Sequence, residues 1–140
     1  MMKLLLVSHG ALATGLLGSF EMIAGKNDSI SAISLTDEGI GSFSTQLKQY
    51  LEERKNEEVL ILCDIKGGTP FNEAYRAFLA DPKQIRVISG MNLPMLIEIG
   101  VMLQADSELE QLVEIGINAG ITSIEGVVEE TENDDEMIEF

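Results

Sequence analysis

The stretch LLVSHGALATG, residues 5–15, decides the fold of this chain, because strand-forming residues pass directly into a helical pattern. Apolar residues fill positions 4–7 without a break, as expected for a strand that is covered on both faces of a sheet. Apolar side chains then recur along residues 12–23 on one face of a helix, and the pattern stops near Gly25. The turn between strand and helix is Ser8-His9-Gly10, and His9 is the only histidine in the sequence.

The same alternation continues along the chain. Residues 30–35, 59–63 and 85–88 have the pattern of strands, and a helical pattern follows each of them. Alternation with short loops predicts right-handed β-α-β crossovers and an α/β fold. We therefore expect a doubly wound, mostly parallel open sheet in the strand order 2-1-3-4, with helices on both faces. Residues 121–128 have the pattern of one further, late strand.

The composition limits what the chain can bind. Its 140 residues suit one domain with its own core. A net charge of −15 argues against nucleic acid, because phosphate binding needs patches of lysine and arginine. A single cysteine, Cys63, excludes an internal disulfide, and one histidine with scattered carboxylates lacks the spacing of a metal site. We expect no metal and no other cofactor.

The two ends of the sequence also carry information. No apolar run reaches the ~18 residues of a membrane span, and the first residues lack a signal-peptide pattern, so we expect a cytoplasmic protein. Residues 125–140 hold eight acidic side chains and no basic one. We expect one domain over residues 1–130 and a mostly solvated acidic tail over Thr131–Phe140. The alternative for this tail is an acidic docking segment.

The expected strand order brings two polar residues together. His9 ends the first strand and Asp64 follows the third, and ligands of doubly wound sheets bind where these carboxyl ends meet. A neutral imidazole can act as a nucleophile through one nitrogen while the other keeps its proton. A carboxylate that accepts this N–H fixes the tautomer and stabilises the charge that develops on the ring. Asp64 is placed for this role.

Glycines beside the two strand ends predict an anion site. Gly67 and Gly68 allow the backbone to approach a ligand, and Thr69 is expected to cap a helix whose N–H groups favour an anion. Gly10 and the start of the first helix offer a similar cradle. The sequence lacks the Gly-Lys-Ser/Thr ending of a Walker loop. A nucleophilic imidazole between two such helix starts suits phosphoryl transfer.

Three stretches, LLVSHGALATGLLGSFEMIAG, DIKGGTPFNEA and VISGMNLPMLIE, resemble in order the IIA component of the mannose family of the bacterial phosphoenolpyruvate-dependent sugar phosphotransferase system (PTS). The resemblance runs from about Lys3 to Val128. It implies a phosphocarrier that accepts a phosphoryl group from the histidine carrier protein HPr and passes it to a IIB component. IIB would phosphorylate a sugar that enters through the membrane permease, IIC and IID.

The resemblance also implies roles for single residues. By motif position, His9 corresponds to the histidine that is phosphorylated on Nε2, and Asp64 to the carboxylate that holds its Nδ1. Thr69 stands where the family has a small hydroxyl residue near the phosphate, and we expect Lys66 to face solvent. The resemblance further implies a homodimer in which the last strand crosses to the partner subunit. The sequence ends soon after the IIA unit, so we expect IIB to be a separate chain.

Two alternatives stay open at this point. The first is a regulatory domain without enzymatic activity that binds a small anion at Gly67–Thr69, with His9 donating only a hydrogen bond. The second makes Asp64 the phosphoryl acceptor, as an acyl phosphate.

Overall fold

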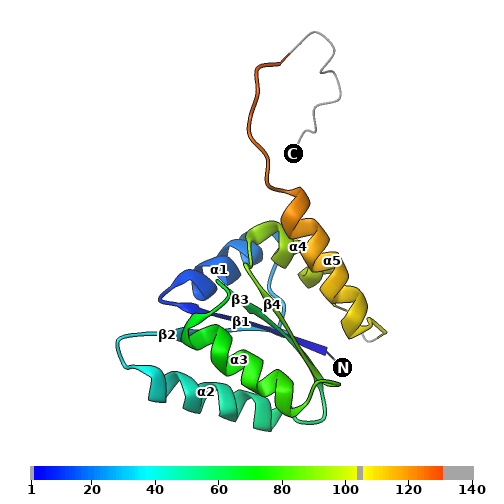
Figure 1. Ribbon diagram of the computed structural model, residues 1–140. Helices are drawn as coiled ribbons and strands as arrows, with labels where there is room; N and C mark the ends of the chain where they lie inside the picture. The colour runs from blue at the N-terminus through cyan, green and yellow to red at the C-terminus, as the bar shows by residue number, and fades with distance from the viewer. Residues whose placement is uncertain (1, 104–105, 131–140) are drawn as a thin grey trace.

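The computed structural model describes residues 2–103 and 106–130, and its helices and strands alternate along the chain (Figure 1). The predicted order of strands and helices is confirmed through residue 120, and the strands end within about two residues of the expected positions. The elements are β1 (Met2–His9), α1 (Leu12–Ala24), β2 (Ile30–Leu35), α2 (Ile40–Glu53), β3 (Glu58–Cys63), α3 (Gly68–Ala80), β4 (Ile85–Ser89), α4 (Leu93–Val101) and α5 (Leu109–Thr122).

The four strands form one parallel sheet in the order β2-β1-β3-β4, as expected from the sequence. The chain winds outward in both directions from β1 and β3, so the switch point lies between these two central strands. In the β1–β3 pair Val7 lies opposite Cys63, and in the β1–β2 pair His9 lies opposite Leu35. The residues that follow these pairs therefore meet at one edge of the sheet.

Helices cover both faces of the sheet and explain the unbroken apolar runs of the strands. Helices α1, α4 and α5 lie on one face, and α2 and α3 lie on the other (Figure 1). Alternate residues of β1 serve the two cores: Leu4 and Leu6 pack on the first side, Leu5 and Val7 on the second, and all four are fully buried. Complete burial of such side chains stabilises the fold by about 1.5–3 kcal/mol each.

The expected late strand over residues 121–128 is wrong for the single chain. Residues 121 and 122 continue α5, and residues 123–130 form neither helix nor strand. A strand needs a hydrogen-bonded neighbour, whereas a helix closes its hydrogen bonds within its own segment. Val127 is completely exposed, and Ile124 and Val128 are each about three-quarters exposed. The expected tail, Thr131–Phe140, lies outside the described residues.

Within the described residues, no helix is both long enough and apolar enough to span a membrane.

Candidate functional site

The sheet brings His9 and Asp64 together at its carboxyl edge, as the sequence predicts, although 55 positions separate them. His9 is the last residue of β1, and Asp64 directly follows β3. The His9 side chain is 45% exposed, whereas that of Asp64 is 8% exposed. The nucleophile candidate is therefore open to a partner, and its carboxylate lies beneath it.

Asp64 accepts three hydrogen bonds that fix its position against the ring. Its Oδ2 accepts one from the backbone N–H of His9 at 2.9 Å and lies 2.8 Å from Nδ1 of the same residue. Its Oδ1 accepts a third from the N–H of Ile65 at 3.0 Å. An ionised carboxylate only accepts hydrogen bonds, so the Nδ1 contact places the ring proton on Nδ1. In the neutral ring, Nε2 then keeps its lone pair.

The environment of Asp64 keeps it ionised at neutral pH. Its partial burial alone would raise the pKa of this carboxyl, but the hydrogen bonds from the backbone and ring of His9 and from Ile65 outweigh it. The pKa of Asp64 is therefore lowered from its ordinary value. A carboxylate that stays charged can stabilise positive charge on the imidazole.

Gly68 lies against the reactive side of the ring. It has a φ of +83°, and a Cβ built there would stand 3.0 Å from Cε1 and 3.2 Å from Nε2 of His9. Its neighbour Gly67 has a φ of +86°, but a Cβ there would meet nothing within 4 Å. Gly68 is therefore required both by its backbone conformation and by the closeness of His9. The closeness to Nε2 could not be found from the sequence, because it depends on the path of the loop.

The helix after this loop begins earlier than the sequence suggests. The expected N-cap was Thr69, but α3 begins at Gly68, its N-cap is Gly67, and no side chain caps it. Thr69 is the second helical residue, and its hydroxyl makes no hydrogen bond within the part of the chain that the structure describes. The two glycines adopt the positive φ values that turn the chain into the helix two residues sooner. The start of α3, with its unpaired N–H groups, thus lies beside His9.

The backbone of Gly10 and the side chain of Ser8 hold the end of β1 in place. The N–H of Gly10 donates to the carbonyl of Leu35 at 2.8 Å, so it is not available to a phosphate. Ser8 is fully buried, and its Oγ accepts a hydrogen bond from the N–H of Ala13 at 2.8 Å and donates to the carbonyl of Gly10 at 3.1 Å. Ser8 therefore ties the end of β1 to the first turn of α1. A serine shortly before a helical pattern is the signal for such a role.

The remaining polar residues nearby contribute less. Lys66 is exposed in the loop after Asp64 and forms no ion pair within the described residues. Cys63 is buried, and burial raises the pKa of its thiol to about 12, so it is not a nucleophile. Among residues 2–103 and 106–130, no group of three or more histidine, cysteine, aspartate or glutamate side chains is placed to hold a metal ion.

A protein-family model matches most of the chain. The model EIIA-man, described as the PTS system fructose IIA component, matches residues 3–115. The chain is 35% identical over 101 residues to the fructose-specific EIIA component of Bacillus subtilis, covering 71% of this chain and 68% of that protein. It is 32% identical over 118 residues to the mannose-specific EIIAB component of Escherichia coli, covering 81% of this chain but only 35% of that longer protein.

Solved structures agree with this fold. The mannose/sorbose-specific IIA subunit of the phosphotransferase system from Enterococcus faecalis superimposes with a TM-score of 0.83 at 34% identity, covering 92% of this chain and 96% of that one. The crystal structure of phosphotransferase system component EIIA from Streptococcus agalactiae gives a TM-score of 0.82 at 30% identity, with 90% and 97% covered.

Proposed function

This chain belongs to the EIIA-man family of mannose-type IIA components of the sugar phosphotransferase system, and from that premise we propose that it is a phosphocarrier acting through His9. In this proposal phospho-HPr donates a phosphoryl group to His9 in the cytoplasm. His9 then passes the group to a IIB component, which phosphorylates the sugar entering through the permease. Its relatives are named for fructose, mannose and sorbose, so the family alone does not assign the sugar.

The observation that carries the proposal is the contact of 2.8 Å between Nδ1 of His9 and Oδ2 of Asp64. It leaves the lone pair of Nε2 on an exposed ring. In the proposed step this lone pair attacks the phosphorus of the donor's phosphohistidine, a new P–N bond forms to Nε2, and the donor's P–N bond breaks. The proton stays on Nδ1, and Asp64 stabilises the positive charge that the substituted ring acquires.

The start of α3 supplies a second contribution to the same step. We propose that the backbone around Gly67, Gly68 and Thr69 binds the phosphoryl oxygens. The first N–H groups of a helix have no partner within it and carry partial positive charge. Gly68 lies against the ring and leaves room at Nε2, which supports this part of the proposal. The free hydroxyl of Thr69 is a further candidate donor.

The proposal includes a homodimer. The outer edge of β4 has no strand partner among the described residues, and residues 123–130 expose Ile124, Val127 and Val128. Apolar side chains that are open on an unpaired segment favour pairing with a second copy. Sedimentation of the protein at several concentrations tests this part independently of phosphoryl transfer.

A labelling assay tests the central proposal. The wild-type protein and His9→Gln are incubated with labelled phosphoenolpyruvate, enzyme I and HPr, and the product is treated with acid and with alkali. We expect acid-labile, alkali-stable label on the wild type and none on the variant. Alkali-labile label that persists in His9→Gln would move the acceptor to a carboxylate such as Asp64. Absence of label on folded wild type with an active donor would favour the anion-binding regulatory domain instead.

A further inference from the structure

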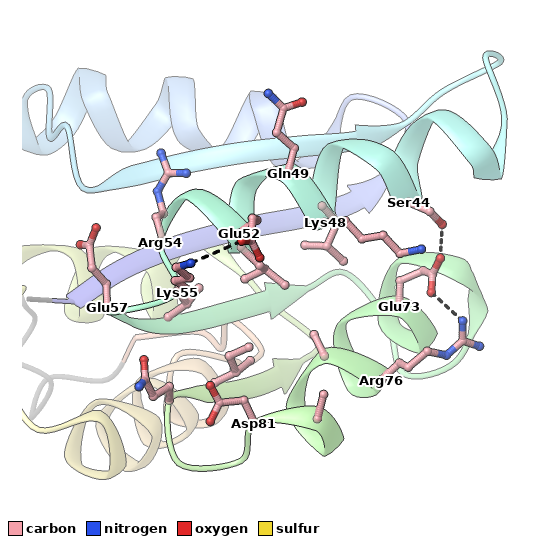
Figure 2. A pocket seen from close by; sticks show the side chains of 17 residues that line it. Ser44, Lys48, Gln49, Glu52, Arg54, Lys55, Glu57, Glu73, Arg76 and Asp81 are labelled. Atoms are coloured by element: carbon pink, nitrogen blue, oxygen red, sulfur yellow. Dashed lines mark hydrogen bonds and ion pairs between the residues drawn. The ribbon is translucent and has the colours of Figure 1, made fainter.

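Helices α2 and α3 lie side by side on one face of the sheet, and a groove separates them along much of their length (Figure 2). The groove has a volume of about 770 Å³, and its apolar floor includes Leu47, Val59 and Ile85. Two helices whose side chains interdigitate leave no such space between them. Over the length of the groove, α2 therefore gives α3 little side-to-side support.

One polar contact closes this groove at the end nearest to the carboxyl edge of the sheet. The hydroxyl of Ser44, on α2, donates a hydrogen bond to Oε1 of Glu73, on α3 (Figure 2). Ser44 is the fifth residue of its helix and Glu73 the sixth, so both lie near the helix starts that face the His9 site. Within the described residues, no other hydrogen bond or ion pair joins a side chain of α3 to the rest of the protein.

The carboxylate of Glu73 is well covered by the protein. Its side chain is 15% exposed, and among the ion-paired carboxylates of the described residues only that of Asp64 is less exposed. Covering a carboxylate costs free energy unless hydrogen bonds offset the lost water. Its second oxygen, Oε2, accepts from Arg76, but that arginine lies on α3 itself and its side chain is largely exposed. Ser44 is therefore the partner through which Glu73 reaches another element.

The apolar contacts of α3 with the sheet are small near its start. The buried residues of this helix are Pro70 and Ala74, which both have short side chains. Its aromatic residues stack on one another along the helix, and they are Phe71, Tyr75 and Phe78. Short side chains contribute few van der Waals contacts, so they resist a tilt of the helix only weakly. A hydrogen bond to a carboxylate is strong and directional, which suits it to fix the angle of α3.

This angle matters because the start of α3 lies against His9. A Cβ built on Gly68 would stand 3.2 Å from Nε2 of His9, so a small movement of the helix start changes the space at this nitrogen. Gly68 precedes Ala74 by six residues, which is about 9 Å along a helix axis. A tilt of ~6° about Ala74 therefore moves the start of α3 by ~1 Å, and a displacement of this size lowers a rate about a hundredfold.

We propose that Ser44 and Glu73 are positioning residues, which hold the start of α3 against the ring of His9. Their consequence for the reaction rests on the proposed function, in which the first N–H groups of α3 bind the phosphoryl oxygens. Neither side chain touches the reacting atoms. Their hydrogen bond acts through the helix, because it sets the place of the N–H groups around Gly68 and Thr69 relative to Nε2.

A distance measurement in the unphosphorylated protein tests the geometry. One Hα atom of Gly68 occupies the place of the absent Cβ, and this place is 3.0 Å from Cε1 of His9. The nuclear Overhauser effect between this Hα and Hε1 of His9 falls steeply with distance. A retreat of the helix start by ~1 Å in Ser44→Ala or Glu73→Ala should reduce it by about half or more. Glu73→Gln should leave it unchanged, because the amide oxygen still accepts from Ser44.

The kinetics of transfer from phospho-HPr distinguish a positioning role from a purely structural one. Ser44→Ala and Glu73→Ala should lower kcat about ten- to hundredfold and leave KM nearly unchanged, because the lost interaction acts in the transition state. Glu73→Gln should keep kcat near that of the wild type. Glu110→Ala is the matched control, since it removes a contact with Arg86 of the same chemistry near the amino edge of the sheet. It should change neither the Overhauser effect nor kcat.

The two readouts also separate this inference from the carrier function. An unchanged Overhauser effect in folded Ser44→Ala and Glu73→Ala overturns the inference, whether or not His9 carries a phosphoryl group. An equal loss in Glu110→Ala would indicate a general loosening of the fold, and a rise in KM at constant kcat would indicate an altered docking surface. Either result also overturns it. A reduced Overhauser effect in a protein whose wild type never accepts label would support the positioning and refute the carrier function.

Discussion

Replacing Gly68 with alanine should stop phosphoryl transfer without unfolding the protein. The new methyl group would stand 3.2 Å from Nε2 of His9, the nitrogen that we propose to carry the phosphoryl group. The ring cannot turn away freely, because its Nδ1 is held by Asp64 at 2.8 Å. The methyl group would therefore occupy space that the incoming phosphorus needs.

The magnitude follows from two separate effects. An alanine at a φ of +83° carries backbone strain of about 1–3 kcal/mol, which lowers the free energy of unfolding. A typical domain is stable by about 5–15 kcal/mol, so the variant stays folded. A misplacement of about 1 Å at a reacting centre lowers the rate about a hundredfold, and we expect at least this loss in transfer.

Gly67→Ala is the matched control for this prediction. Its φ of +86° imposes comparable backbone strain, but its methyl group would meet nothing within 4 Å. The assay is the initial rate of labelling from phospho-HPr, with the free energy of unfolding measured in parallel by denaturant titration. Both variants should lose stability, and only Gly68→Ala should lose transfer. Equal transfer rates in the two variants would refute the steric argument.

Four further predictions concern this site and the charge of the chain. Asp64→Asn should slow transfer about ten- to hundredfold, because one amide cannot accept from all three N–H donors and a hydrogen bond to a charged group is worth about 1.5–3 kcal/mol. Because the pKa of Asp64 is lowered in the folded protein, its ionised carboxylate stabilises the native state above about pH 4, and this stabilisation is lost as the pH falls through the lowered pKa. The free energy of unfolding, measured by urea titration, should therefore fall with acid in the wild type and fall less in Asp64→Asn. Ser8→Ala should lower the free energy of unfolding by about 1–3 kcal/mol in the same titrations, because the buried N–H of Ala13 loses its acceptor. Ser34→Ala should leave it nearly unchanged, since the buried Ser34 Oγ has no partner within the described residues. Transfer from phospho-HPr should slow steeply with added salt if opposite potentials steer the encounter with a chain of net charge −15. A transfer rate that is the same at low and moderate ionic strength would argue against steering.

The sequence alone determined the fold class and the pairing of His9 with Asp64. Helical spacing and apolar runs are local properties, so they predicted each element through residue 120. The handedness of β-α-β crossovers then restricted the strand order, and this order places the ends of β1 and β3 side by side. The placement of His9 beside Asp64 followed from this topology without any coordinates.

Only the tertiary structure decided the features that depend on contacts between distant segments. The 3.2 Å approach of Gly68 to Nε2, the use of the Gly10 N–H by Leu35 and the tie from Ser8 to Ala13 each require the path of a loop in space. The late strand expected over residues 121–128 is absent for a related reason, since the single chain offers this segment no neighbouring strand to pair with. Helices are specified within a segment, whereas strand pairing, loop geometry and the groove between α2 and α3 are specified by what the fold brings next to them.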